Sequence, residues 1–213
     1  MNVKLEQVLP SEIEKRSFEI ITEELEGRCF PKEQELIIKR VIHTTADFEY
    51  ADTLTFSEKA VESARNAIME GAYIVTDTQM GKAGIHKKTL ERFGGEVICF
   101  MSDEDVAKCA KKNGTTRAIA SMDKAVSLNK KLIVAIGNAP TALVRLYELI
   151  KEGRLKPELV IGVPVGFVNV VQSKELIMST QVPYIVARGR KGGSNVAVAI
   201  CNALLYSLDN NRE

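Results

Sequence analysis

Three short apolar runs, each followed by a loop and then a helical segment, most constrain how this chain folds. The runs lie near residues 132–136, 159–163 and 184–187. Short and nearly unbroken apolar runs are typical of parallel strands that are covered on both faces. The loops that follow parallel strands meet at one edge of an open α/β sheet, where such folds bind ligands. The pattern therefore predicts one shared pocket, and the basic residues of the last loop favour an anionic ligand.

Two further strand-like runs, at 73–76 and 97–100, alternate with helical segments in the same way. The predicted fold class is therefore α/β: a five-stranded or slightly larger, mainly parallel, doubly wound sheet with helices on both faces. Two helices are expected at the N-terminus, and residues 1–213 are expected to form a single domain. Ser11, Ser57, Ser102 and Thr115 are the predicted helix N-caps.

Composition excludes several classes of function. The chain has 29 Lys and Arg against 28 Asp and Glu, so its net charge of +1 favours neither nucleic acid nor a membrane surface as a partner. No apolar run is long enough to cross a bilayer, and no secretion signal is evident, so we expect a cytoplasmic protein.

The cysteines and the missing motifs exclude other chemistry. Cys29, Cys99, Cys109 and Cys201 form no close pair, and reduced, buried or half-buried thiols are expected. No cluster has metal-ligand spacing, so we predict no metal site. The Gly-x-Gly-x-x-Gly pattern is missing from the first strand–helix turn, and neither a P-loop nor a Gly-x-Ser-x-Gly elbow occurs.

The strongest local signal is the basic loop at 188–194. Three cations and three glycines directly before a helix N-terminus predict a nest for carboxylates or phosphates, against the alternative of a flexible loop in water. The turn at 137–141 adds a glycine that permits close approach of a ligand and the free N–H groups of a helix start. The loop residues predicted to bind the ligand are Gly137, Asn138, Ala139, Thr141, Gly166, Phe167, Arg188, Gly189, Arg190, Gly192, Gly193 and Ser194.

Only two histidines are present. His43 ends an apolar helical stripe beside Arg40, and histidine is the side chain best suited to moving protons near neutral pH. The alternative for His43 is a structural interaction with the C-terminus of its helix. His86 lies beside Lys87 and Lys88, where a solvated face is expected.

Several stretches, in the same order along the chain, make this sequence resemble the precorrin-8X methylmutase family, which includes the cobalt-precorrin-8 methylmutases. The resemblance extends from Ser17 to Leu204. The matching stretches are Arg40-Val41-Ile42-His43, Ile136-Gly137-Asn138-Ala139-Pro140-Thr141-Ala142-Leu143, Gly162-Val163-Pro164-Val165-Gly166-Phe167-Val168, Ser173-Lys174-Glu175, and Val182-Pro183-Tyr184 through Arg188-Gly189-Arg190-Lys191-Gly192-Gly193-Ser194.

The resemblance implies an isomerase of cobalamin biosynthesis that uses no organic cofactor. Such an enzyme moves a methyl group from C-11 to C-12 of precorrin-8 or its cobalt counterpart, giving hydrogenobyrinate or cobyrinate. It also implies that His43 is the general acid, and that the protein is a homodimer with its site near the subunit interface. By the same resemblance Ser17, Arg40, Arg117, Ser173 and Lys174 are substrate contacts.

Two alternatives remain open from the sequence. One is a Rossmann-like nucleotide-dependent enzyme, which the missing glycine pattern disfavours. The other is a non-catalytic tetrapyrrole carrier. Binding of NAD or S-adenosylmethionine would favour the first, and a bound precursor whose spectrum never changes would favour the second.

Overall fold

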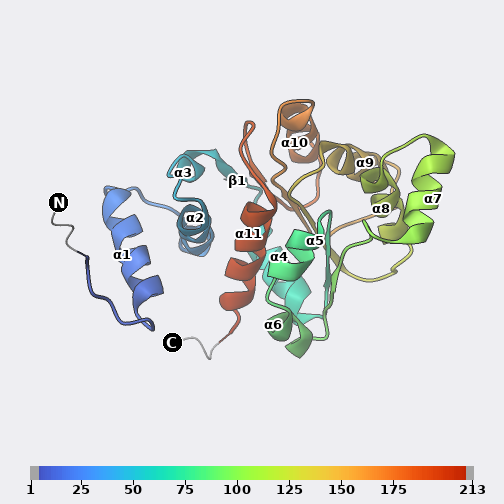
Figure 1. Cartoon of the computed structure of the whole chain (residues 1–213). Helices are drawn as coiled ribbons and strands as arrows, with labels where there is room; N and C mark the ends of the chain where they lie inside the picture. Colours follow the sequence, from blue (N-terminus) through green and yellow to red (C-terminus); the bar gives the residue numbers. More distant parts are fainter. Residues whose placement is uncertain (1–4, 210–213) are drawn as a thin grey trace.

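A computed structural model describes residues 5–209 and contains one six-stranded sheet with helices on both of its faces (Figure 1). The strand order is β1-β6-β5-β4-β2-β3, and every neighbouring pair is parallel except β1 with β6. The predicted mainly parallel α/β sheet is therefore confirmed. The strands are β1 (Leu54–Phe56), β2 (Tyr73–Thr76), β3 (Val97–Ile98), β4 (Leu132–Ile136), β5 (Leu159–Gly162) and β6 (Tyr184–Ala187).

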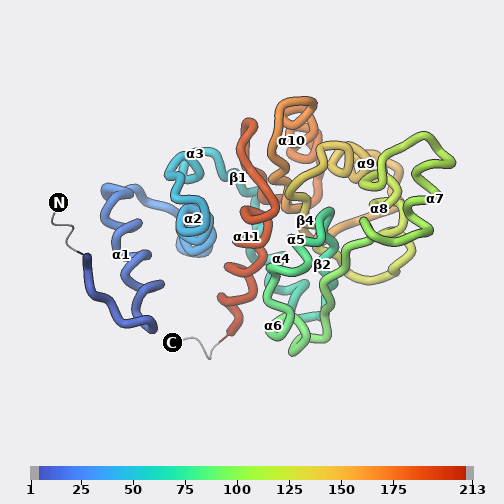
Figure 2. Tube along the Cα trace, in the orientation of Figure 1, coloured from blue at the N-terminus to red at the C-terminus, as the bar shows by residue number. Residues whose placement is uncertain are grey.

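The helices form two layers around the sheet. Helices α2, α4 and α11 contribute to the core on one face, and α8, α9 and α10 contribute to the core on the other. The two predicted N-terminal helices are present and lie side by side (Figure 2). The helices are α1 (Ile13–Glu24), α2 (Lys32–Thr45), α3 (Tyr50–Thr53), α4 (Ala60–Met69), α5 (Gln79–Gly84), α6 (Lys87–Arg92), α7 (Glu104–Asn113), α8 (Arg117–Val126), α9 (Pro140–Lys151), α10 (Val170–Met178) and α11 (Ser194–Tyr206).

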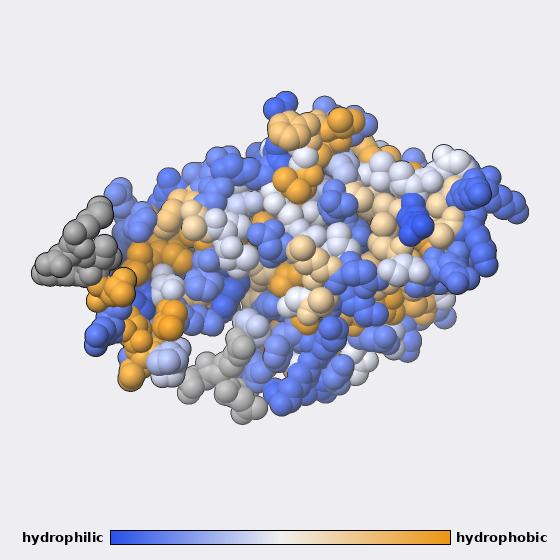
Figure 3. Space-filling view, in the orientation of Figure 1, coloured by the Kyte–Doolittle hydropathy of each residue, from blue (hydrophilic) through white to orange (hydrophobic). Residues whose placement is uncertain are grey.

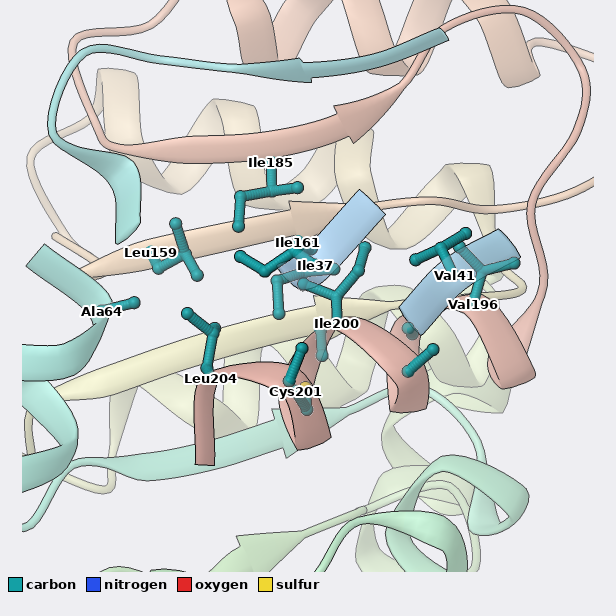
Figure 4. Packing of buried hydrophobic residues seen from close by; sticks show 14 of the residues in the cluster. Ile37, Val41, Ala64, Leu159, Ile161, Ile185, Val196, Ile200, Cys201 and Leu204 are labelled. Carbon is teal, nitrogen blue, oxygen red and sulfur yellow. The ribbon is translucent and has the colours of Figure 1, made fainter. Parts of the chain in front are cut away.

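Strand β4 shows why the apolar runs read as buried strands. All five of its residues are buried, and they alternate between the two cores: Ile133 and Ala135 face one, whereas Val134 faces the other. Alternation along a strand sends successive side chains to opposite faces. On the first face, Ile37 of α2, Ile161 of β5 and Ile200 of α11 meet (Figure 4).

The register brings the carboxyl ends of the central strands to one edge. Thr76 pairs with Ala135, Ile136 with Gly162, and Gly162 with Val186. The loops that follow β2, β4, β5 and β6 therefore begin side by side, as expected from the sequence.

The segment before α4 differs from the prediction. Ser57 does not cap a helix; its backbone N–H donates to the Tyr184 carbonyl, and its Oγ accepts from the Tyr184 N–H. Ser57 thus continues the pairing of β1 with β6, and α4 starts after Lys59, which has a left-handed backbone. A three-residue edge strand carries too little periodic pattern to be recognised without its partner.

Three other predicted helix N-caps are each wrong by one residue. Ser11, Ser102 and Thr115 are not the N-caps; Glu12, Asp103 and Thr116 take those positions, and of these only Thr116 accepts a cap bond with its side chain. The segment that follows β2 contains α5, which is capped by Thr78, whose Oγ1 accepts from the Gly81 N–H at 3.0 Å. Adjacent polar residues compete for one cap, so a shift of one residue is not resolved by pattern alone.

The four thiols are free, but only Cys99 and Cys201 are buried. Cys29 and Cys109 are exposed, so the expectation that all four thiols are at least half-buried is wrong. Burial raises the pKa of Cys201 to about 12. Between residues 5 and 209, no helix combines the length and apolarity that a membrane crossing requires.

Candidate functional site

The backbone N–H groups at the start of α9, which we expected to bind the ligand, are bonded to a carboxylate of the protein itself. Asp77, directly after β2, is 1% exposed, and its carboxylate accepts from the N–H groups of Gly137 (2.9 Å), Asn138 (2.9 Å) and Ala139 (2.6 Å). Burial raises the pKa of this carboxyl, and the three N–H donors act in the opposite direction. The expectation that these N–H groups are free for a ligand is wrong.

Gly137 has a packing reason to be glycine. A Cβ at this position would lie 2.6 Å from the Ser194 Cα and 2.9 Å from the Ser194 N. The start of α11 therefore touches the Gly137 backbone, and Ser194 Oγ lies 2.8 Å from Thr78 Oγ1. The glycine permits contact between two loops of the protein, where we expected contact with a ligand.

The basic loop is held on the side of β5 and α10. The Gly166 N–H donates to the Arg190 carbonyl at 3.2 Å, and the Gly193 N–H donates to the Val163 carbonyl at 2.8 Å. A Cβ on Gly192 would collide with the Val163 carbonyl oxygen, so only glycine fits there. The loop is thus tied to the chain that follows β5 and is not a free segment in water.

Ser173 and Lys174 lie beneath this loop. Ser173 is fully buried, and its hydroxyl donates to the Val170 carbonyl. Lys174 is 1% exposed, and its Nζ donates to the carbonyls of Gly189 (2.8 Å) and Lys191 (2.9 Å). Burial lowers the pKa of Lys174 to about 8. Neither side chain reaches the surface where we expected substrate contact.

The cations of the loop divide into two kinds. Lys191 Nζ is bound by Asp47 (2.6 Å) and Glu49 (2.7 Å). The Lys191 ammonium lowers the pKa of Asp47, and the two carboxylates raise the pKa of Lys191. Arg188 and Arg190 are exposed and form no ion pair with any residue between 5 and 209. The Arg190 guanidinium lies 5.5 Å from the centroid of the Phe167 ring, which is 81% exposed.

Arg117 belongs to the same edge. It is exposed at the start of α8, where its Nη1 donates to the Met101 carbonyl at 3.5 Å. Its neighbour Thr116 has its Oγ1 3.2 Å from Thr141 Oγ1 at the start of α9. Arg117 and the turn at 137–141 are therefore neighbours.

His43 occupies the last turn of α2, with an exposed ring stacked on Phe18 of α1 at 5.5 Å between centroids. Within the described part of the chain, neither ring nitrogen has a hydrogen-bond partner. Ser17 precedes Phe18 and bonds within its own helix, to the Ile13 carbonyl. The imidazole is held by ring stacking, and both of its nitrogens remain open to a ligand.

Arg40 lies one turn before His43 and links three elements. Its guanidinium packs against the rings of Phe18 (4.8 Å) and Tyr206 (5.1 Å) and pairs with Glu14 at 2.6 Å. Its Nε is buried and has no acceptor among residues 5–209. A buried donor without an acceptor is unusual in a protein interior.

His86 is not on a solvated face, contrary to the expectation. It is half-buried, its ring meets that of Tyr206 edge-on at 5.6 Å, and its Nδ1 lies 2.8 Å from Thr89 Oγ1. The two histidines therefore differ in availability: His86 is engaged within the protein, whereas His43 is open.

The predicted residues thus form two groups with one link. One group lines the sheet edge and consists of Arg117, residues 137–141, Gly166, Phe167 and residues 188–194. The other group lies on α1 and α2 and consists of Ser17, Arg40 and His43. The link is Lys191, because its partner Asp47 follows His43 by four residues. In Figure 1 the loop before α11 projects at the top of the molecule, between α3 and α10.

Three contributors were not identified from sequence: Asp77, Asp47 and Phe18. Asp77 did carry a signal, since a carboxylate directly after a buried strand lies at the edge where the loops meet. Phe18 reads as an ordinary core residue in a helical stripe, and Asp47 pairs with a residue 144 positions away. Pairs so distant are decided by the fold.

The arrangement suits binding of a polyanion and transfer of a proton. Exposed guanidinium groups supply anion contacts, and an exposed imidazole without a protein partner is suited to proton transfer. Among residues 5–209, His, Cys, Asp and Glu side chains nowhere gather in a group of three suited to a metal ion.

Comparison with known proteins finds similarity to one enzyme family over nearly the whole chain. The family model described as precorrin-8X methylmutase matches residues 12–207. The cobalt-precorrin-8 methylmutase of Priestia megaterium is 49% identical over 95% of this chain and 90% of its own length. The precorrin-8X methylmutase of Pseudomonas aeruginosa is 38% identical, over 90% of this chain and 93% of its own.

A solved structure extends the agreement to the fold. The precorrin-8x methyl mutase of Thermus thermophilus superposes with a TM-score of 0.84 at 41% identity, covering 92% of this chain and 96% of that one. The family match, the identities and the superposition each span nearly the whole chain, and the chain belongs to the precorrin-8X methylmutase family.

Proposed function

We propose that this protein moves the methyl group of precorrin-8, or of its cobalt counterpart, from C-11 to C-12, with His43 as the general acid. The observation that carries the proposal is the state of His43. Its ring is exposed and stacked on Phe18, and both nitrogens are free of protein partners within residues 5–209. General acid catalysis needs such a group within hydrogen-bond reach of the substrate.

The sheet edge supplies a place for the carboxylates around the macrocycle. Arg188, Arg190 and Arg117 are exposed, and none forms an ion pair in the described chain. Arg40 adds a buried Nε without an acceptor, close to His43. These cations bind the carboxylates, while exposed Phe167 meets an apolar part of the ring.

The reaction is an isomerisation within one molecule, so it needs a rigidly held substrate and stabilisation of developing charge. We propose that it uses no cofactor and that any cobalt enters as part of the substrate. We also propose a cytoplasmic homodimer with the site near the interface. Exposed apolar side chains at Leu5, Leu9 and Ile13 and at Val165, Phe167 and Val168 support such an interface (Figure 3).

The test incubates the protein separately with metal-free and cobalt-containing precorrin-8 and follows the visible spectrum. His43→Ala should reduce kcat at least about 100-fold, because a positioned general acid contributes roughly 10²–10⁴. His86→Gln, a change at the only other histidine, is the matched control and should stay within a few-fold of the parent.

The outcomes separate the alternatives. Retained turnover in His43→Ala removes the general-acid role. A bound precursor whose spectrum is stable in the parent protein identifies a carrier, and no binding of either substrate contradicts the whole assignment.

A further inference from the structure

The side-chain ammonium of Lys174 is buried and donates its hydrogen bonds to carbonyls of the basic loop at 188–194. It is 1% exposed in α10, and no carboxylate between residues 5 and 209 pairs with it. Its two acceptors are the carbonyls of Gly189 and Lys191, at 2.8 and 2.9 Å. Burying an ammonium without a counterion is costly, so this position suggests a use beyond packing.

The carbonyl between these two is also held. The Arg190 oxygen accepts from the Gly166 N–H at 3.2 Å. Three consecutive carbonyls, those of residues 189, 190 and 191, therefore accept hydrogen bonds from Lys174 of α10 and from Gly166 in the loop that precedes it. The contacts alternate between one side-chain cation and one backbone amide.

Peptide geometry then decides where the neighbouring N–H groups point. No peptide bond in the described chain is cis, and in a trans peptide the C=O of one residue is antiparallel to the N–H of the next. The N–H groups of Arg190 and Gly192 therefore point away from the Lys174 ammonium, and the N–H of Lys191 points away from the Gly166 N–H. None of the three donates to a protein acceptor among the described residues.

We infer that Lys174 is a positioning residue: it turns the carbonyls of the 188–193 loop inward so that the N–H groups of residues 190–192 face a carboxylate of the substrate. Successive outward N–H groups form an anion-binding concavity, and exposed Arg188 and Arg190 flank it. This role replaces the direct substrate contact expected for Lys174. The ligand named here rests on the proposed function.

The test variant is Lys174→Met, which keeps an unbranched side chain but has no donor. Without the ammonium, the carbonyls of Gly189 and Lys191 turn toward water and the N–H groups lose their common direction. We expect KM for metal-free precorrin-8, and Kd for the product hydrogenobyrinate, to rise about 10-fold, since charge-assisted bonds hold the loop. We expect kcat to stay within about threefold, because a carboxylate contact at the rim is equal in ground and transition states.

Lys108→Met is the matched control, since Lys108 is 79% exposed in a surface pair with Glu104. Urea midpoints of both variants check that the fold is retained. A general packing defect would lower kcat and the urea midpoint together, whereas the positioning role predicts that KM and Kd rise while neither kcat nor the urea midpoint falls. KM and Kd values within twofold of the parent overturn the inference.

Gly192→Ala tests the same loop if Lys174→Met fails to fold. Its Cβ meets the Val163 carbonyl oxygen and displaces the loop while Lys174 is kept. It should raise KM and Kd in the same way, and unchanged values contradict the inference. Product binding without turnover in the parent overturns the proposed function alone, because the Kd values still decide the role of Lys174; no product binding in the parent overturns both.

Discussion

Asp77 and Lys174 are buried charges at the same edge of the sheet, and each is solvated by backbone groups with no opposite charge beside it. Asp77 collects three N–H groups from the turn between β4 and α9, whereas Lys174 collects two carbonyls from the loop between β6 and α11. The turn belongs to the centre of the sheet, with Gly137 buried, whereas Gly189 is exposed. A buried charge that is hydrogen-bonded by backbone groups therefore stabilises the fold at Asp77 and orients a binding loop at Lys174.

The difference follows from what surrounds the backbone groups. If Asp77 is lost, the Gly137 N–H stays buried and has no water to replace the carboxylate. If Lys174 is lost, the exposed loop can turn its carbonyls to solvent. The first loss should appear mainly in the free energy of unfolding and the second mainly in substrate affinity.

Asp77→Ala should give the largest effect on stability. The buried Gly137 N–H and two part-buried N–H groups lose their acceptor. Each unsatisfied buried group costs about 1–3 kcal/mol and a part-buried group costs less, so we expect a loss of about 3 kcal/mol. Urea unfolding at pH 7 measures it. Glu104→Ala, at an exposed site on α7, is the control and should change stability by less than about 1 kcal/mol. A loss below 1 kcal/mol in Asp77→Ala would remove the distinction between the two regions.

The pH dependence of Lys174→Met sharpens the comparison. The pKa of Lys174 in the native protein, about 8, lies below its ordinary value of 10.5, so the unfolded chain holds the proton more tightly between these values. The free energy of unfolding of the parent should therefore rise relative to Lys174→Met from pH 8 to pH 10.5, by up to about 3 kcal/mol. Urea unfolding of both proteins at pH 7.5 and pH 10 measures the difference. A constant difference would show that the ammonium is not desolvated.

The smallest effect is expected for the ion pairs of Lys191 with Asp47 and Glu49, which connect the two groups of site residues. The double change Asp47→Asn with Glu49→Gln releases Lys191, and because surface pairs contribute little we expect KM to rise only about threefold. Lys191 lowers the pKa of Asp47, so the ion pair between them is complete at neutral pH. It is lost as the pH falls through this lowered pKa. Steady-state kinetics at pH 7 measure KM, with Glu104→Gln as the control. A rise as large as that in Lys174→Met would show that both anchors orient the loop equally.

Much of the fold was readable from sequence because its strands are buried on both faces. The central strands β4, β5 and β6 carry continuous apolar runs, which need no knowledge of a partner. Strand β1 was missed because its three residues are defined by pairing with β6, and Ser57 was misread as a cap for the same reason.

The placement of the candidate site residues could be anticipated only in part. The exposed arginines of the basic loop and the open ring of His43 are where the sequence led us to expect them. The turn at 137–141 was misjudged because a local pattern shows that N–H groups are available, but not that a carboxylate 60 positions earlier already fills them. Lys174 was misjudged because burial of a lysine is a property of the packed structure.

The sequence by itself determined the parallel sheet, the edge at which its loops gather, the net charge and the family resemblance, because each depends on local pattern or on matched order along the chain. Only the tertiary structure decided which polar groups are hydrogen-bonded within the protein and which remain available to a ligand. The physical reason is that hydrogen-bond satisfaction depends on distances between segments far apart in sequence. Asp77 and Lys174 each find their partners in this way, and Arg188, Arg190 and His43 are left open.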